Sequence, residues 1–196
     1  METTELIKKS LRGDETAFRI LVDQYADFAY AAALKILNNE EDAKDVVQDA
    51  FLSVWKNLHG FNAGMNFSNW LYKIIINRCF DALRKKKRER VIYPDHDSWE
   101  LISVAAESDP QKELSDREFG KLVGKMTEKL SAKQKIAFVL CDLEDLPREE
   151  ASEIAGMNTT SLKSNLNHAR RKIEKMMEKF IEHEEGRKIP ESAKNN

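Results

Sequence analysis

Aromatic and basic side chains follow one another between Phe61 and Lys85, and together they have the chemistry to bind unpaired nucleic acid. Aromatic rings can stack on exposed bases, while lysine and arginine hold the phosphate backbone. The candidates for contact with a base are Phe61, Asn66, Phe67, Trp70 and Tyr72. The polar and basic candidates that follow them are Lys73, Asn77, Arg78, Arg84 and Lys85.

The same segment has a second interpretation, in which its rings and aliphatic residues form a helical core and the basic run only solvates the helix end. Trp70 fits that core, because it stands at helical spacing from Ile74. Asn66 and Phe67 stand in the expected loop before the helix. They are therefore the better candidates for contact with a flipped base.

A second group of candidate DNA-binding residues lies near the C-terminus, in the segment "LPREEASEIAGMNTTSLKSNLNHARRKIEKM". A short helix, a turn with Gly156 and a longer helix with a polar face are typical of a helix-turn-helix that reads DNA. Small and amide side chains can approach base edges, and arginines can reach phosphates. The polar face carries Thr160, Ser161, Lys163, Ser164, Asn167, Arg170 and Arg171. The alternative is an ordinary helical hairpin with a solvated basic face.

A third candidate surface lies on the helix expected over residues 40–58, opposite its apolar stripe. Asp45, Gln48, Asp49 and Leu52 share this face at steps of three and four residues. An exposed leucine among acidic residues favours a protein-docking surface. A merely solvated acidic face is the alternative.

The remaining residues point to no enzyme, cofactor or metal. The four histidines are scattered without metal-ligand spacing, and there is no glycine-rich phosphate loop. Cys79 and Cys141 stand far apart, which favours a reduced, cytoplasmic protein. No apolar run approaches the ~20 residues needed to span a membrane, and the polar N-terminus predicts no signal peptide.

The net charge of −2 disfavours a free-standing nucleic-acid binder. The charge is segregated, however. Residues 78–90 hold seven basic and two acidic side chains, a local net of +5, whereas residues 93–117 hold seven acidic and two basic ones, a net of −5. Such asymmetry suggests different partners for different segments.

The elements that must position these residues are all expected to be helices. Few glycines and prolines, with abundant Ala, Leu, Lys and Glu, favour an all-α fold. Asp14, Asn39, Asn66 or Ser68, Ser131 with Gln134, and Asn158 or Thr159 can cap helix starts. Phe119 begins an apolar stripe through Leu130. We expect two small helical domains, residues 1–90 and 115–180, joined by a flexible acidic linker, 91–114, and followed by a polar tail, 181–196.

Two long motifs resemble one known family. The stretch "EDAKDVVQDAFLSVWKNLHGFNAGMNFSNWLYKIIINRCFDALRKKKR" resembles region 2 of bacterial sigma-70 factors, and "LSAKQKIAFVLCDLEDLPREEASEIAGMNTTSLKSNLNHARRKI" resembles their region 4. Both regions on one short chain, with no room for a third domain, resemble the extracytoplasmic-function (ECF) subgroup.

The resemblance implies a subunit that binds core RNA polymerase and directs promoter recognition and DNA melting. Region 2 would melt the −10 element and trap an unpaired base, while Asp45, Gln48, Asp49 and Leu52 would dock on the clamp helices of the largest polymerase subunit. Region 4 would contact the polymerase flap and read the −35 element. The implied −35 contacts are Thr159, Thr160, Ser161, Lys163, Ser164, Asn167, Arg170 and Arg171.

The implied partners are core RNA polymerase, promoter DNA and an anti-sigma factor, and the implied location is the cytoplasm, at the nucleoid. Because polymerase supplies part of the DNA affinity, the net acidity of the chain is understandable. Two other functions stay open at this point. An autonomous helix-turn-helix repressor would bind duplex DNA alone, and a helical protein-interaction adaptor would have no promoter-specific activity.

Overall fold

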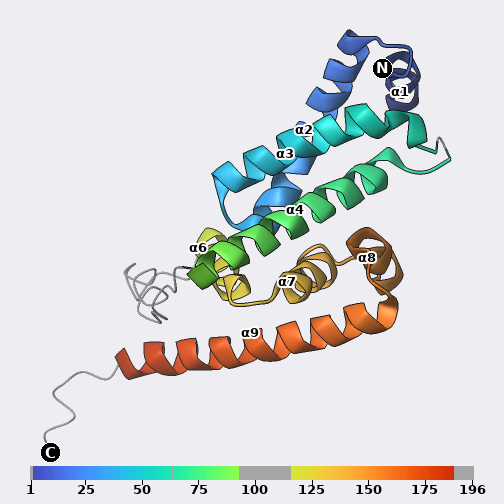
Figure 1. Cartoon of the computed structure of the whole chain (residues 1–196). Helices are drawn as coiled ribbons and strands as arrows, with labels where there is room; N and C mark the ends of the chain where they lie inside the picture. The colour runs from blue at the N-terminus through green and yellow to red at the C-terminus, as the bar shows by residue number, and fades with distance from the viewer. Residues whose placement is uncertain (1, 63, 93–115, 188–196) are drawn as a thin grey trace, which may run out of the picture.

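The computed structural model describes residues 2–62, 64–92 and 116–187, and every regular element within them is helical, as expected (Figure 1). The N-terminal half, residues 2–92, contains α1 (Thr3–Ser10), α2 (Glu15–Leu37), α3 (Glu40–Asn57), a short 3₁₀ turn η1 (Leu58–Gly60) and α4 (Phe67–Ile92). The C-terminal half, residues 116–187, contains α6 (Asp116–Glu128), α7 (Ala132–Phe138), a π-helical turn η3 (Val139–Leu143), α8 (Arg148–Ala155) and α9 (Thr159–Arg187).

Side-chain caps start the helices of the N-terminal half where the sequence predicts them. Asp14 accepts a hydrogen bond from the Ala17 amide at 3.0 Å, and Asn39 accepts one from the Asp42 amide at 2.9 Å. Asn66, rather than Ser68, provides the acceptor before α4, at 2.8 Å from the Ser68 amide. Each cap satisfies a backbone donor that the first turn of a helix leaves unpaired.

The helix-turn-helix of the C-terminal half is confirmed in the same way. Ser131 and Gln134 form a reciprocal capping box at the start of α7. Gly156 ends α8 in the left-handed conformation, with φ of 61°, which a residue without a Cβ adopts at little cost. Asn158 then caps α9 by accepting from the Ser161 amide at 2.7 Å.

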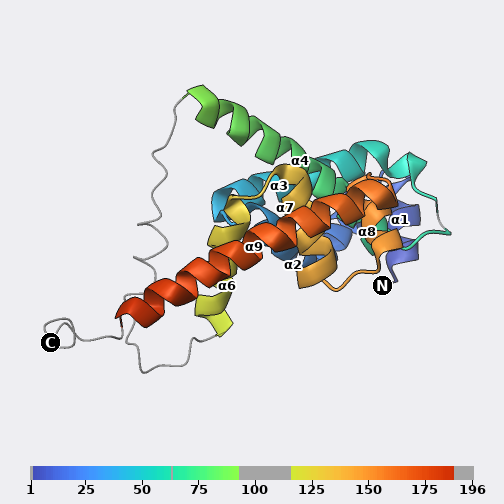
Figure 2. The same cartoon turned by 90° about the horizontal axis from the view of Figure 1, so that it is seen from below.

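The two halves share one hydrophobic core. Helices α2, α3 and α4 enclose residues such as Leu21, Val54 and Leu71, and the same cluster continues into Ile136 and Leu140 of the C-terminal half. Figure 1 shows α4 lying against α7 and α8, with α9 on the far side of them, and Figure 2 shows α9 crossing over α7.

Two features differ from the sequence-based expectations. Phe119 is 51% exposed rather than part of the core, because the apolar stripe of α6 joins the buried clusters with α9 further along, through Leu122, Val123 and Met126. Helix α1 was not expected, because eight residues are too few to display a helical period. Burial of Leu6 and Ile7 stabilises it where propensity alone could not.

Two helices extend beyond the domain boundaries expected from the sequence, which end at residues 90 and 180. Helix α4 continues to Ile92, and α9 continues to Arg187, into the segment expected to be a tail. The rest of the expected linker and tail lies outside the described residues. Among the described helices, none is long and apolar enough to cross a membrane.

Candidate functional site

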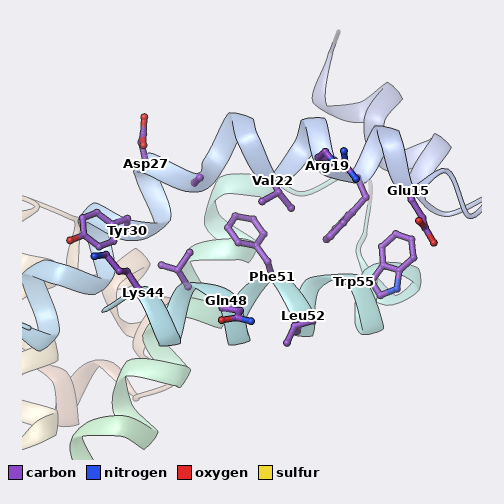
Figure 3. Close-up of a pocket in the computed structure, with 13 residues that line it drawn as sticks. Glu15, Arg19, Val22, Asp27, Tyr30, Lys44, Gln48, Phe51, Leu52 and Trp55 are labelled. Atoms are coloured by element: carbon purple, nitrogen blue, oxygen red, sulfur yellow. The ribbon is translucent and has the colours of Figure 1, made fainter. Parts of the chain in front are cut away.

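An apolar groove of about 740 Å³ lies between α2 and α3 (Figure 3). Val22 and Tyr30 come from α2, while Phe51, Leu52 and Trp55 come from α3. Charged side chains line it as well, namely Glu15, Arg19, Asp27 and Lys44. An apolar floor with a charged border is the usual anatomy of a surface that binds another protein.

Two large side chains of this groove are left exposed in the free protein. Leu52 is 49% exposed and Trp55 is 39% exposed, although the Trp55 ring packs on Phe18 with centroids 4.7 Å apart. Exposed apolar surface that is contiguous and has a polar border indicates an interaction site.

The four predicted docking residues are all exposed, but the structure divides them between two depressions. Gln48 and Leu52 line the apolar groove. Asp45 and Asp49 line a second depression, beside basic residues of α4 such as Arg84. The acidic pair therefore neighbours the basic end of α4 as well as the groove.

Trp55 is a groove residue that the sequence analysis did not select. It stands three positions after Leu52 and seven after Gln48, so the three share one helix face. This helical spacing could have identified Trp55 from the sequence, since the same spacing of three and four residues identified Leu52.

The aromatic cluster at the start of α4 corrects one expectation. Phe67 is only 4% exposed, with its ring 4.9 Å from that of Tyr25 and 5.6 Å from that of Phe61. Because Asn66 caps the helix, Phe67 is its first residue and turns onto α2 instead of standing in the loop. Phe61 and Trp70, with ring centroids 5.2 Å apart, keep part of their surface exposed. Among the candidate rings described so far, these two are the ones that keep surface open to solvent.

Tyr72 is likewise a core residue rather than an exposed stacking platform. It is 6% exposed and packs edge-on against Phe28, with centroids 5.5 Å apart. Its hydroxyl has no hydrogen-bond partner among the described residues. Burial, reinforced by the neighbouring acidic groups Glu144 and Cys79, raises the pKa of Tyr72 well above its usual value.

The exposed face of α4 carries the polar and basic candidates. Lys73, Asn77, Arg84 and Lys85 are all exposed there. Arg78 differs, because it also donates a hydrogen bond to the Ser53 hydroxyl at 2.6 Å. That bond ties α4 to α3.

The polar face of α9 is presented to solvent as predicted. Its exposed members are Thr159, Thr160, Lys163, Ser164, Asn167, Arg170 and Arg171, while Ser161 is half-buried.

Arg170 on this face is engaged within the chain. It makes a double ion pair with Asp142, through Nε at 2.9 Å and Nη2 at 2.5 Å, and the hydrogen bond raises its pKa. Arg170 would have to leave Asp142 before it could hold a phosphate, whereas Arg171 has no ion pair to break among the described residues.

The described residues offer neither a metal site nor a reactive buried cysteine. No group of three or more His, Cys, Asp or Glu side chains there could hold a metal ion. Burial raises the pKa of Cys79 to about 12, so its thiol stays protonated and unreactive near neutral pH.

Comparison with known proteins finds a family match for each half of the chain. Residues 21–89 match the family described as Sigma-70 region 2, and residues 121–173 match Sigma-70, region 4. The chain is 27% identical to the ECF RNA polymerase sigma factor SigW of Bacillus subtilis, over 87% of this chain and 94% of SigW. It is 30% identical to the RNA polymerase sigma factor SigV of the same organism, over 76% of this chain and 83% of SigV.

A solved structure shares the fold. It is the sigma factor RpoE in complex with the anti-sigma factor NepR from Bartonella quintana, with a TM-score of 0.57 and 22% identity. The similarity covers 82% of this chain and 96% of that one.

Proposed function

Because the chain belongs to the ECF group of the sigma-70 family of RNA polymerase sigma factors, we propose a division of its surfaces between polymerase and promoter DNA. The protein binds core RNA polymerase and directs promoter recognition for transcription initiation. The assignment of individual residues to these tasks is the proposal.

The groove between α2 and α3 is the polymerase-docking surface. Gln48 and Leu52 line it, Trp55 extends it, and Asp45 and Asp49 stand on the neighbouring acidic side of α3. Burial of the exposed parts of Leu52 and Trp55 supplies affinity, while the carboxylates favour a basic partner surface and set its orientation. We expect the clamp helices of the largest polymerase subunit to be that partner.

The start of α4 captures an unpaired base of the −10 element. Phe61 and Trp70 provide exposed ring surface, and Asn66 provides amide groups beside them. Lys73, Asn77, Arg84 and Lys85 then hold the strand along α4, as electrostatic contacts to a phosphate backbone require. Phe67 and Tyr72 support this surface from the core.

The N-terminal part of α9 reads the −35 element. Thr159, Thr160, Ser164 and Asn167 offer short polar groups for base edges, and Lys163 and Arg171 offer charges for phosphates. Ser161 and Arg170 contribute less, since one is half-buried and the other pairs with Asp142.

The observation that carries the proposal is the separation of the apolar groove from the polar and basic faces. The groove lies on α2 and α3, whereas those faces lie on α4 and α9, and only Asp45 and Asp49 border the basic end of α4. Polymerase and DNA can therefore be held at the same time. The protein has no catalytic role of its own in this assignment, and it acts in the cytoplasm at the nucleoid.

An anti-sigma factor completes the set of partners. Sigma factors of similar fold are bound by such proteins, as in the RpoE–NepR complex. The domain limits, 1–90 for region 2 and 115–180 for region 4, follow the expected ones.

Reconstituted transcription tests the assignment. Core polymerase with the protein should produce transcripts from a subset of genomic promoter fragments, and the protein alone should bind those fragments weakly. Gln48→Ala with Asp49→Ala should lower polymerase affinity and spare DNA contacts, whereas Lys163→Ala should do the reverse. Nanomolar, sequence-specific duplex binding by the protein alone would instead support the autonomous repressor.

A further inference from the structure

Ser53 of α3 is hydrogen-bonded to the basic face of α4. It is only 9% exposed, and its Oγ accepts a hydrogen bond from Nη2 of Arg78 at 2.6 Å. The same hydroxyl donates to the backbone carbonyl oxygen of Asp49, four residues earlier, at 2.7 Å. A hydroxyl has one proton and two lone pairs. Because the proton goes to Asp49, the lone pairs are left for Arg78, and the two hydrogen bonds fit together.

The bond between Ser53 and Arg78 has the features of a strong one. Its donor is charged, and hydrogen bonds from a charged donor are shorter and stronger than those between neutral groups. The buried position of Ser53 also keeps water from competing for its oxygen. The bond therefore favours one orientation of the guanidinium.

Ser53 holds Arg78 without neutralising it, because the serine is uncharged. None of the ion pairs between described residues includes Arg78. A guanidinium has several N–H donors, so most of them stay available after the bond to Ser53 has formed. Arg78 is exposed and can offer these donors to a ligand.

The ligand would lie in a depression of about 600 Å³ between α3 and α4, which Arg78 lines. Five basic and four acidic side chains line it, so its local charge nearly balances. Binding of an anion there then depends on which cations are unpaired and correctly oriented. The basic residues are Arg78, Arg84, Lys85, Lys86 and Arg88, and the acidic ones are Asp42, Asp45, Asp49 and Asp81.

Three cations of this depression are held in three different ways. Arg78 donates to a serine hydroxyl, and Arg84 lies over the Phe80 ring, 5.6 Å from its centroid. Lys86 instead forms an ion pair with Asp42 at 2.9 Å. A phosphate must displace that carboxylate before it can bind Lys86, whereas a hydroxyl or a ring leaves the cation its charge. The two arginines are therefore better prepared for a phosphate than the lysine.

We propose that Ser53 is a positioning residue for promoter binding, which holds the charged Arg78 guanidinium where a phosphate of the DNA strand passes the depression between α3 and α4. The inference rests on the proposed function, in which α4 holds the promoter strand. Ser53 is too deeply buried to contact DNA itself. Its effect is to reduce the side-chain freedom that Arg78 loses on binding.

A double-mutant cycle tests the positioning role. The probe is a genomic promoter fragment that the reconstituted holoenzyme transcribes. Ser53→Ala removes the acceptor and keeps a residue that favours helix, and it should lower promoter affinity of the holoenzyme about three- to tenfold. Arg78→Ala should lower it at least as much and reduce the salt slope by about one unit. Affinity for core polymerase should stay unchanged in both.

The cycle shows whether Ser53 acts through Arg78. In protein that already carries Arg78→Ala, the further change Ser53→Ala should alter promoter affinity by less than about twofold. Losses that simply multiply in the double variant would overturn the positioning role, because Ser53 would then act independently of Arg78.

Two other serine variants serve as controls. Ser53→Thr keeps the hydroxyl, and a helical threonine can still bond the carbonyl one turn earlier, so promoter affinity should return to the wild-type value. Ser10→Ala is the matched control, because Ser10 is 5% exposed and donates to the Leu6 carbonyl oxygen at 2.8 Å. It should leave promoter affinity unchanged. An equal loss for Ser10→Ala and Ser53→Ala would speak for a merely structural effect and against the proposal.

Replacement of single phosphates by uncharged methylphosphonates locates the contact on the DNA. Wild-type holoenzyme should lose affinity at the phosphate that Arg78 binds, and Arg78→Ala and Ser53→Ala should both become insensitive at that same phosphate. An unchanged pattern for either variant would overturn the proposal. Failure of the wild-type holoenzyme to bind any promoter fragment would instead overturn the proposed function.

Discussion

Leu52→Ala should weaken binding of core polymerase without weakening the fold. Leu52 is 49% exposed in the free protein. Complete burial of a leucine side chain contributes ~1.5–3 kcal/mol, so covering the exposed half contributes ~1 kcal/mol. Truncation to alanine should therefore raise the Kd for core polymerase about fivefold.

The fold should tolerate this change, because about half of the Leu52 side chain already contacts water. We expect a loss of no more than ~0.5 kcal/mol in the free energy of unfolding, as for other surface substitutions. Urea unfolding followed by circular dichroism measures that loss, and fluorescence anisotropy of labelled protein titrated with core polymerase measures the Kd.

Ile20→Ala is the matched control. Ile20 is 36% exposed on α2 and does not line the groove, so its truncation removes similar apolar surface from a position without a proposed partner. Equal polymerase affinities for the Leu52 and Ile20 variants would refute the docking surface. A selective fivefold loss for Leu52→Ala would support it.

Other predictions concern DNA contacts, titration and the turn of the helix-turn-helix. Asn66→Asp keeps the cap of α4 but removes the amide donors, so closed-complex binding should persist while permanganate detects less open complex. Lys163→Ala should reduce the salt dependence of promoter binding by about one counterion, whereas Lys175→Ala should not. Because burial raises the pKa of Cys79 to about 12 from an ordinary value of 9.0, its protonated thiol stabilises the fold fully below pH 9. That contribution should be lost between pH 9 and 12, by at most ~1.4 kcal/mol per pH unit, and Cys79→Ala should unfold with a weaker alkaline dependence in urea. Gly156→Ala should cost ~1–2 kcal/mol of unfolding free energy, because its φ of 61° suits glycine, and Gly156→Asn should cost less.

Local structure was predictable from the sequence because local chemistry decides it. Asp14, Asn39 and Asn158 cap helices as their side chains suggest, and Gly156 takes the left-handed turn. These effects act within one helical turn, so no knowledge of the distant chain is needed.

The exposure of individual rings was harder to predict, because it depends on which helices meet. Phe67 and Trp70 are three residues apart on α4, and periodicity alone does not say which faces α2. The structure buries Phe67 against Tyr25 and leaves part of Trp70 exposed. Phe119 became exposed for the same reason, since its stripe has a neighbour only further along α6.

Contacts between the two halves left no recognisable pattern in the sequence. The Asn38 amide and the Gly124 carbonyl, which are hydrogen-bonded, are 86 positions apart, and nothing in the sequence around either residue marks the two as partners. Their pairing depends on the packing of complete helices, which a window of a dozen residues does not contain. The candidate docking and DNA surfaces were identifiable, whereas their arrangement relative to each other was not.

The common core of the two halves has a consequence for cooperativity. Because Leu71 and Ile136 belong to one buried cluster, melting either half would expose apolar surface of the other. The protein should therefore unfold in a single calorimetric transition, with equal van't Hoff and calorimetric enthalpies. Neither half carries its stability alone, because part of the apolar surface that each buries is covered by the other.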